Sequence, residues 1–224
     1  MADIFASYKW LALYYDRSIF LEGLATTLEV ALCAIVLALI LGVLFGVAGV
    51  FPHKGARLVN RIYVEFFQNT PLVIQAIFLY HALPHLHIML PVAAIGVLGI
   101  GIYAGAYVSE IIRSGINAVP KGQMEAGLAQ GLTYGQIMRY IILPQTKRSI
   151  LPALGNQGIA IIKNTSVLAM IAGGDLMYAA DSWAGFHMYY GPAYVVTGII
   201  YWLMCFPLTK CVERLEKKAE VSSR

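Results

Sequence analysis

Charged residues are scarce in this chain of 224 residues, because they make up 12% of it, against 59% hydrophobic residues. Soluble domains usually carry about a quarter of charged residues, so the shortage indicates that lipid is the main solvent. There are only 3 cysteines, an odd number without metal-ligand spacing, which gives no disulfide framework. No Gly-Lys dipeptide occurs, which excludes a Walker A loop and ATP hydrolysis by that route.

Long apolar stretches are present instead, and they predict an all-α integral membrane protein. A helix needs roughly 20 apolar residues to cross the hydrocarbon layer, and lipid offers no partner for free backbone groups, so each span should be helical. Aromatic residues in the segment 1–23 predict a helix lying on the membrane surface before the transmembrane region 24–212. Five stretches qualify as spans: about Leu24–Val50, Ile62–Leu83, Met89–Ile112, Ile150–Ala172 and Ala193–Cys211.

The distribution of basic residues predicts the orientation, since Lys and Arg accumulate in short loops on the cytoplasmic side. Most of the 16 Lys and Arg residues follow the first, third and fifth stretches, and the loops after the second and fourth have none. This pattern places the N-terminus outside and the C-terminus inside, with a cytoplasmic loop at 113–149 and a cytoplasmic tail at 213–224. The net charge of +4 mostly reflects this asymmetry and does not indicate nucleic-acid binding.

The least apolar long stretch, EAGLAQGLTYGQIMRYIILPQ (125–145), lies in that loop. Its local signals predict two short helices. Gly131 suits the left-handed end of the first helix, and Thr133 with Gln136 has the spacing of a capping box at the start of the second. Pro144 is expected to end the second helix. The alternative to a helix–turn–helix with a function of its own is an ordinary structured loop.

The same stretch resembles a motif of ABC importer permeases: E-A-A, three residues, G, nine residues, I-x-L-P. Glu125, Ala126 and Gly131 match it, as does the ending IILP at 141–144, whereas Gly127 replaces the third alanine at a cost in helix propensity of about 1 kcal/mol. The resemblance implies a coupling helix that docks into a groove of a separate ATP-hydrolysing subunit. The implied coupling residues are Glu125, Ala126, Gly127 and Gly131.

Three further segments are similar to the subgroup of these permeases that imports polar amino acids, the histidine/glutamate/glutamine/arginine/opine family. They are FFQNTPLVIQ (66–75), AYVSEIIRSGINAVPKGQ (106–123) and IIKNTSVLAMIA (161–172), with Gln68 and Asn69 in place of the usual Arg and Gly. The resemblance implies a type I importer permease in a bacterial cytoplasmic (inner) membrane, working as a dimer with an identical or homologous permease. It also implies an ABC ATPase dimer and an extracytoplasmic solute-binding protein. This chain would bind no cofactor and no metal, and ATP and Mg would belong to the ATPase.

Polar side chains inside the spans are candidates for contact with the transported solute, because polar groups at mid-depth are costly in lipid. Pro71 should break the second span and free the carbonyl group of Phe67, and broken helices often form substrate sites. The candidate substrate-binding residues are Thr70, Gln157, Lys163, Asn164 and Ser166. Periodicity does not put all of them on one face.

Two roles fit Lys163: attracting the carboxylate of an amino acid, or serving structure by capping carbonyl groups of a neighbouring helix or pairing with a glutamate across a subunit interface. The hydroxyl groups of Thr165 and Ser166 are expected to bond back to their own helix.

Other charged residues fit structural roles better. Arg61–Glu65 and Glu110–Arg113 have the i,i+4 and i,i+3 spacings of helical ion pairs, with gating as the alternative. Glu29 either extends toward the outer surface or faces a partner subunit. His81, His85 and His87 indicate a solvated outer loop, with a zinc site as the alternative.

The sequence therefore favours the membrane-spanning subunit of an ATP-driven importer of polar amino acids. Neutral Gln157 and cationic Lys163, without an acid at mid-depth, favour glutamine or glutamate over arginine. Alternatives are an ion-coupled secondary carrier, which would need inverted repeats and its own intramembrane carboxylates, and a permease of the same class for a basic amino acid or cystine. A membrane enzyme lacks a nucleophile–base set, and a purely structural subunit would need neither Lys163 nor a broken span.

Overall fold

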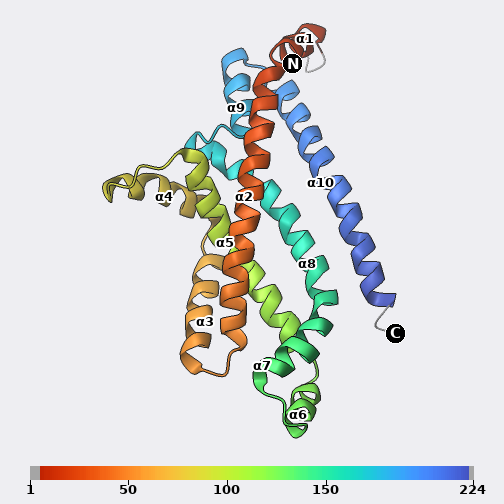
Figure 1. Ribbon diagram of the computed structural model, residues 1–224. Helices are drawn as coiled ribbons and strands as arrows, with labels where there is room; N and C mark the ends of the chain where they lie inside the picture. The colour runs from red at the N-terminus through yellow and green to blue at the C-terminus, as the bar shows by residue number, and fades with distance from the viewer. Residues whose placement is uncertain (1–5, 222–224) are drawn as a thin grey trace.

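The computed structural model describes residues 6–221, and within them every regular element is a helix (Figure 1). Residues 1–5 of the expected surface segment and 222–224 of the expected tail lie outside the described part. The α-helices are α1 (Ser7–Tyr15), α2 (Arg17–Val50), α3 (Lys54–Gln68), α4 (Leu72–His85), α5 (Val92–Asn117), α6 (Lys121–Ala129), α7 (Tyr134–Ile137), α8 (Leu143–Asn164), α9 (Leu176–His187) and α10 (Tyr190–Val221). A π-helical turn at Met138–Ile142 precedes α8, and a 3-10 helix at Thr165–Ile171 follows it.

Three helices, α2, α5 and α10, are each long and apolar enough to cross a membrane. Two further pairs pass the same test together but are bent, α3 with α4 by 98° and the stretch Tyr134–Ile171 with α9 by 44°. The described residues therefore contain three spans, or up to five if each bent pair counts as one. The long helices expected at the first, third and fifth stretches are confirmed, and the number of five spans stays a prediction.

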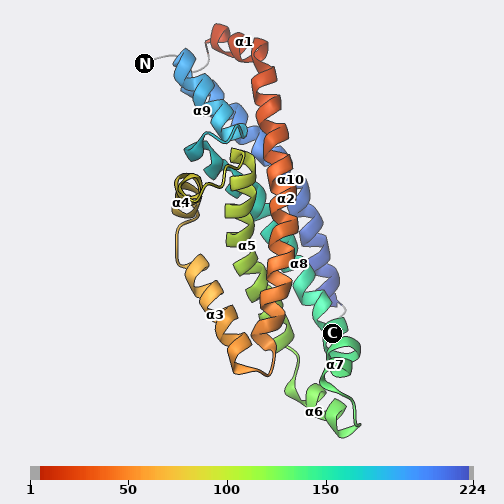
Figure 2. The ribbon, with the colours of Figure 1, turned by 60° about the vertical axis from the view of Figure 1, so that its left-hand side comes forward.

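The second expected span, Ile62–Leu83, is a pair of helices that meet nearly at a right angle, not a single kinked helix. Figure 2 shows α3 running beside α2 and α4 turning away from it. The backbone of Pro71 is extended, with φ −61° and ψ 134°, and a residue before proline disfavours helical angles. Three consecutive residues, Asn69 to Pro71, therefore leave the helix, so the change of direction exceeds that of a kink.

The expectation that Pro144 ends a helix is wrong. The chain passes from α7 through the π-helical turn Met138–Ile142 into α8, which begins at Leu143 rather than near Ile150. The N–H group of Leu143 donates to the carbonyl oxygen of Met138, five residues back. Pro144 then falls in the first turn of α8, where a missing N–H group leaves no intrahelical bond unmade.

The core of the molecule is the contact between α2 and α5, which lie side by side (Figures 1 and 2). Small residues allow the close approach. A Cβ atom at Gly42 would lie 2.2 Å from Val108 Cγ1, and one at Gly101 would lie 2.6 Å from Leu37 Cδ2. Such packing is typical of membrane helices, because hydrocarbon competes with large apolar side chains and close backbone contact supplies the attraction.

The turn between α1 and α2 is fixed to α9 at one end of the molecule (Figure 1). Trp183 Nε1 donates a hydrogen bond to Asp16 Oδ2 at 2.8 Å, and His187 Nε2 lies 3.2 Å from the same oxygen. Phe20 packs edge-on against the ring of Trp183. The start of α2 and the whole of α9 therefore form one unit.

Candidate functional site

The loop between α5 and α8 projects at the end of the molecule opposite α1 (Figures 1 and 2). The expected local structure is confirmed there. Gly131 has a positive φ of 78° after α6, and Thr133 with Gln136 forms a capping box at the start of α7. Glu125 and Ala126 are exposed on α6. Two of the expected coupling residues are therefore accessible on the surface of the loop.

Gly127, the residue that departs from the E-A-A motif, is buried against α7. A Cβ atom there would lie 2.7 Å from Ile137 Cγ1, and the side chain of Ile137 is fully buried. An alanine would push Ile137 aside, so the glycine serves the packing of α6 on α7. This contact was not predictable from local signals, because it joins two helices across the turn at Gly131.

The loop is also connected to the membrane-spanning part at two places. Tyr134 Oη donates a hydrogen bond to the carbonyl oxygen of Val50, at the end of α2, at 3.3 Å, and its ring lies edge-on to that of Phe51. In addition, α7 continues through the π-helical turn into α8 without a loop. A displacement of α6 and α7 would therefore be carried to both α2 and α8.

Backbone carbonyl groups at the break between α3 and α4 accept hydrogen bonds from a nearby side chain. Gln75 Nε2 lies 3.1 Å from the carbonyl oxygens of Phe67 and Thr70 and 2.8 Å from Thr70 Oγ1. Thr70 Oγ1 in turn donates to the carbonyl oxygen of Phe66 at 2.8 Å. The break thus frees the carbonyl group of Phe67 from the helical hydrogen bonding, as expected. This carbonyl group accepts a hydrogen bond from the side chain of Gln75 instead. Gln75 was missed because it stands eight residues away along the chain.

Thr70 lies at the rim of an apolar hollow of about 370 Å³ beside the break. The other lining residues are Phe66, Phe67, Ile74, Gln75, Phe78, Leu79, Gly99 and Ile102. None of the other four candidate substrate-binding residues lines this hollow, and the hydroxyl group of Thr70 already has two partners.

Of the four remaining candidates, Gln157, Lys163 and Asn164 lie in the second half of α8, and Ser166 lies in the 3-10 helix that follows. Lys163 and Ser166 line a second hollow, of about 330 Å³, with residues of α9 and α10. Gln157 and Asn164 follow Ile150 at intervals of seven residues, which places the three on one helical stripe. Ile150 packs against Gly115 of α5, so the beginning of that stripe faces α5. Of the five candidates, the structure brings only Lys163 and Ser166 together at one hollow.

Hydroxyl groups next to Lys163 bond back to their own helix, as expected. Thr165 Oγ1 donates to the carbonyl oxygen of Ile162 at 2.7 Å, and Ser166 Oγ donates to that of Lys163 at 2.8 Å. The side chain of Lys163 is exposed and forms no ion pair within residues 6–221. It is the one formal charge among the lining residues of the second hollow.

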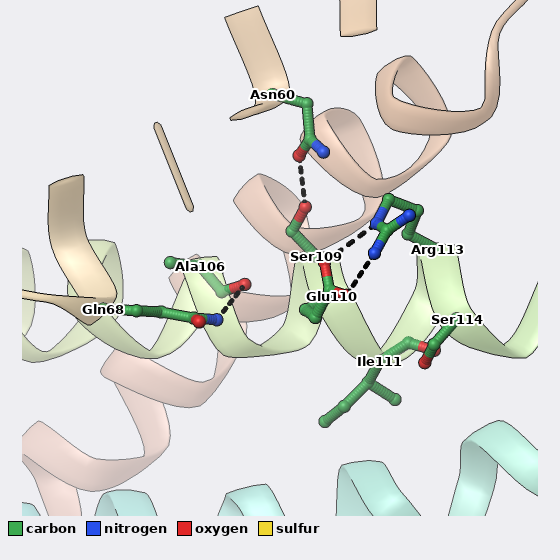
Figure 3. A network of polar contacts seen from close by, with 8 residues as sticks. All are labelled: Asn60, Gln68, Ala106, Ser109, Glu110, Ile111, Arg113 and Ser114. Carbon is green, nitrogen blue, oxygen red and sulfur yellow. Dashed lines mark hydrogen bonds and ion pairs between the residues drawn. The ribbon is translucent and has the colours of Figure 1, made fainter. Parts of the chain in front are cut away.

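A polar network joins α3 to α5 below the break (Figure 3). Ser109 Oγ donates to Asn60 Oδ1 at 2.7 Å in a buried contact, and Gln68 Nε2 donates to the carbonyl oxygen of Ala106 at 3.3 Å. The two expected ion pairs flank this network. Arg61 Nε lies 2.7 Å from Glu65 Oε1, and Arg113 Nε donates to Glu110 Oε2 at 2.9 Å. Both pairs lie within single helices, which fits their structural interpretation.

The three histidines of the segment 81–87 lie on the last turns of α4 and just beyond its end. No group of three or more His, Cys, Asp or Glu side chains that could hold a metal ion occurs within residues 6–221. His81 and His85, on the last turns of α4, are exposed, and His87 follows with a positive φ of 59°. Glu29 is exposed on α2, and no partner of its side chain occurs in the described part of the chain.

Comparisons with known proteins agree with this arrangement. The model of the family described as "binding-protein-dependent transport system inner membrane component" matches residues 25–221. The probable glutamine ABC transporter permease protein GlnM of Bacillus subtilis (strain 168) is 36% identical over 210 residues, which cover 94% of this chain and 97% of that protein. The arginine transport system permease protein ArtQ of the same organism is 34% identical over 200 residues, or 88% and 91% of the two chains.

Two solved structures have the same fold. An amino acid ABC transporter crystallised with histidines superposes with a TM-score of 0.86 at 32% identity, covering 93% of this chain and 98% of that chain. The MetNI methionine ABC transporter, in an inward-facing conformation, superposes with a TM-score of 0.70 at 17% identity, covering 88% and 96%. At that lower identity the likeness concerns the fold alone.

Proposed function

The chain belongs to the family of binding-protein-dependent transport system inner membrane components, and from that premise we propose that it is the membrane-spanning subunit of an ATP-driven importer of polar amino acids, with glutamine as the favoured substrate. The relatives named above include a probable glutamine permease and an arginine permease. Without a Gly-Lys dipeptide the chain has no Walker A loop. ATP is therefore hydrolysed by a separate subunit.

The observation that carries the proposal is the continuity of the exposed loop with α8. Glu125 and Ala126 are exposed on α6. Gly127 allows α6 to pack closely against α7. The chain then continues from α7 into α8 without a loop. A dimer of ABC ATPases that closes on ATP would draw two such loops together. The same movement would shift α8, with Gln157, Lys163 and Asn164, relative to α5 and α10.

The partners and the location follow from this mechanism. Up to five spans are too few to enclose a pathway easily, so a second permease, identical or homologous, completes it. The solute arrives from an extracytoplasmic binding protein, and the complex lies in a bacterial cytoplasmic (inner) membrane. The N-terminus is outside, so that the loop 113–149 faces the ATPase. Thr70, Gln157, Lys163, Asn164 and Ser166 are the proposed contacts of the solute.

Uptake by the reconstituted complex tests the proposal. The permease, its ATPase and its binding protein are placed in vesicles, and entry of labelled glutamine is followed with and without ATP. We expect ATP-dependent accumulation, which stops when the catalytic glutamate of the ATPase is changed to glutamine. Accumulation that follows an ion gradient and needs no ATP would contradict the proposal, as would the absence of uptake of any amino acid.

Arginine is the second candidate substrate, because an arginine permease is 34% identical to this chain. Competition separates the two candidates. Unlabelled arginine should leave glutamine entry unchanged if glutamine is the substrate, whereas strong inhibition by arginine would identify a permease for basic amino acids. An ion-coupled secondary carrier is excluded as the class of this chain by its family.

A further inference from the structure

A polar hollow of about 380 Å³ lies between α3, α5 and the end of α2. None of the proposed solute contacts lines it. Its lining carries three positive and two negative formal charges, so that one positive charge is in excess. The polar lining residues are Arg57, Arg61, Arg113, Glu65, Glu110 and Asn60.

Hydrogen-bond donors outnumber acceptors in this hollow. The carboxylate of Glu65 lies 2.7 Å from Arg61 Nε, and Arg113 donates to both carboxylate oxygens of Glu110. Both acids are therefore already paired. The guanidinium group of Arg57, in contrast, forms no ion pair or hydrogen bond within residues 6–221. Its N–H groups are donors only, so they remain available to an acceptor from outside the chain.

Asn60 supplies a second available donor, and its side chain is 4% exposed. Its Oδ1 accepts the hydrogen bond of Ser109 (Figure 3), and its Nδ2 has no acceptor in the described part of the chain. This nitrogen is not among the side-chain atoms that are closed off from solvent without a partner, so it is open to the hollow. A Cβ atom at Gly49 would lie 2.5 Å from Asn60 Nδ2 and 3.1 Å from Arg113 Cδ. The glycine therefore leaves the space beside both donors unfilled.

The hollow lies at the level of the lipid headgroups. Gly49 is one residue before the end of α2, Arg57 is in the first turn of α3, and Arg113 is four residues before the end of α5. At about 1.5 Å per residue, each lies within about 6 Å of a helix end. In the proposed orientation these ends are at the cytoplasmic surface, where the headgroup region adjoins the hydrocarbon layer.

The exposed side of α3 next to the hollow is apolar. Leu58, Ile62 and Phe66 are exposed and follow each other at intervals of four residues, which places them on one stripe. Each comes directly after a charged residue that lines the hollow. A ligand whose charged group occupies the hollow therefore has an apolar surface beside it, which suits a lipid better than a water-soluble anion.

We propose that this hollow binds the phosphate group of an anionic phospholipid of the inner leaflet. Arg57 and the amide of Asn60 donate hydrogen bonds to its oxygens, and the acyl chains lie along the apolar stripe of α3. Basic pockets between membrane helices on the cytoplasmic side commonly bind such headgroups. The excess of one positive charge favours an anionic headgroup over a zwitterionic one. The inference takes only the orientation of the chain from the proposed function.

Lipid binding to the permease–ATPase complex in uncharged detergent tests the inference. Phosphatidylglycerol and phosphatidylcholine are titrated separately, and native mass spectrometry counts the bound molecules. We expect the wild type to prefer phosphatidylglycerol. Arg57→Gln should weaken its binding by about tenfold or more, because hydrogen bonds to a charged group are stronger than neutral ones. This variant should also lose the preference for phosphatidylglycerol.

Three further variants separate a specific site from general attraction to the surface. Lys54→Gln removes the same charge from α3, but Lys54 does not line the hollow, so it should bind phosphatidylglycerol as the wild type does. Arg57→Lys keeps the charge without the planar fork of donors and should bind with intermediate strength. Gly49→Ala fills the space beside Asn60 and should weaken binding without a change of charge.

The midpoint temperature of unfolding is the second measurement, since a ligand of the folded state raises it. Phosphatidylglycerol should raise the midpoint of the wild type and of Lys54→Gln, but not that of Arg57→Gln. Inorganic phosphate at the same concentration should have no effect. If it stabilises the wild type as strongly as the lipid does, and leaves Arg57→Gln unchanged, the ligand is a free phosphate and the lipid is excluded.

Two other results would overturn the inference: equal binding of phosphatidylglycerol by the wild type and Arg57→Gln, or an equal loss of binding in Arg57→Gln and Lys54→Gln. The second would show general attraction to a basic surface. None of these measurements involves transport, so ATP-dependent uptake would stand in each case. Absence of that uptake, with lipid binding as expected, would in turn contradict only the proposed function.

Discussion

The backbone of Gly127 lies against the side chain of Ile137 so closely that a Cβ atom at position 127 would be 2.7 Å from Ile137 Cγ1. Ile137 is fully buried and belongs to the core that α2, α5 and α8 share. The contact therefore fixes the exposed α6, with Glu125, to the membrane-spanning part. The close contact with Ile137 explains why glycine replaces the third alanine of the E-A-A motif. The lower helix propensity of glycine matters less here than this steric requirement.

Gly127→Val is expected to detach α6 from α7. Its branched side chain cannot fit beside Ile137, and overpacking of this kind typically costs about 1–3 kcal/mol. The amount of ATPase that copurifies with the permease should fall strongly, and ATP-dependent uptake with it. Gly122→Val is the matched control, since it lies in the same helix and a Cβ atom there meets nothing within 4 Å. Equal retention of the ATPase by both variants would show that the contact does not position the loop.

Gly131→Ala is expected to destabilise the turn between α6 and α7. Gly131 has a φ of 78°, and the left-handed conformation costs a residue with a Cβ atom about 1–2 kcal/mol. Hydrogen–deuterium exchange of residues 128–137 should become faster, and less so in Gly131→Asn, because asparagine tolerates this conformation. Gly135→Ala, at a position with open space and without a positive φ, should slow exchange or leave it unchanged. Identical exchange in all three variants would contradict the assignment.

Local signals in the loop were sufficient to predict its turn and its capping box, because both depend on residues within a few positions of each other. The behaviour of Pro144 was not predictable in the same way. A proline disrupts a regular α-helix, but the π-helical turn at Met138–Ile142 shifts the hydrogen-bond register so that Pro144 enters a first turn. Whether a chain ends a helix or inserts such a turn depends on its tertiary packing.

Apolar length predicted the long helices α2, α5 and α10, but it did not predict the angle of the break at Pro71. The amide of Gln75 donates hydrogen bonds to the carbonyl groups of Phe67 and Thr70 across the break, and these contacts were not foreseen. The division of the candidate residues of α8 between two sides followed from helical periodicity.

Gln75→Leu is expected to destabilise the permease at the break. Leucine has a similar size but donates no hydrogen bond, so the two carbonyl groups lose their partner. An unsatisfied group costs about 1–3 kcal/mol when buried, and this site is partly buried, so the lower part of that range applies. The midpoint temperature of unfolding in detergent should fall. Gln123→Leu is the control, because Gln123 is exposed on α6, and this variant should keep the wild-type midpoint. An equal midpoint for the two variants would count against the role of Gln75.

Asn60 and Ser109 are expected to stabilise the contact of α3 with α5 as a pair. Both side chains are buried, 4% and 0% exposed, and Ser109 Oγ donates to Asn60 Oδ1 at 2.7 Å. Each single change to alanine leaves a buried polar partner, whereas the double change removes both groups. The free energy lost by the double variant should therefore be smaller than the sum of the two single losses, by about 1 kcal/mol.

A second cycle provides the control for this coupling. Ser114 Oγ donates to the carbonyl oxygen of Ile111 in its own helix at 3.2 Å, so Ser114→Ala and Asn60→Ala should add without interaction. The free energies come from thermal or denaturant unfolding in the same detergent for all variants. If the losses of Asn60→Ala and Ser109→Ala add as simply as those of the control pair, the hydrogen bond between them does not hold α3 on α5. The position of the break at Pro71 would then depend on the two other hydrogen bonds that join these helices, from Gln68 to Ala106 and from Tyr63 to Ile102.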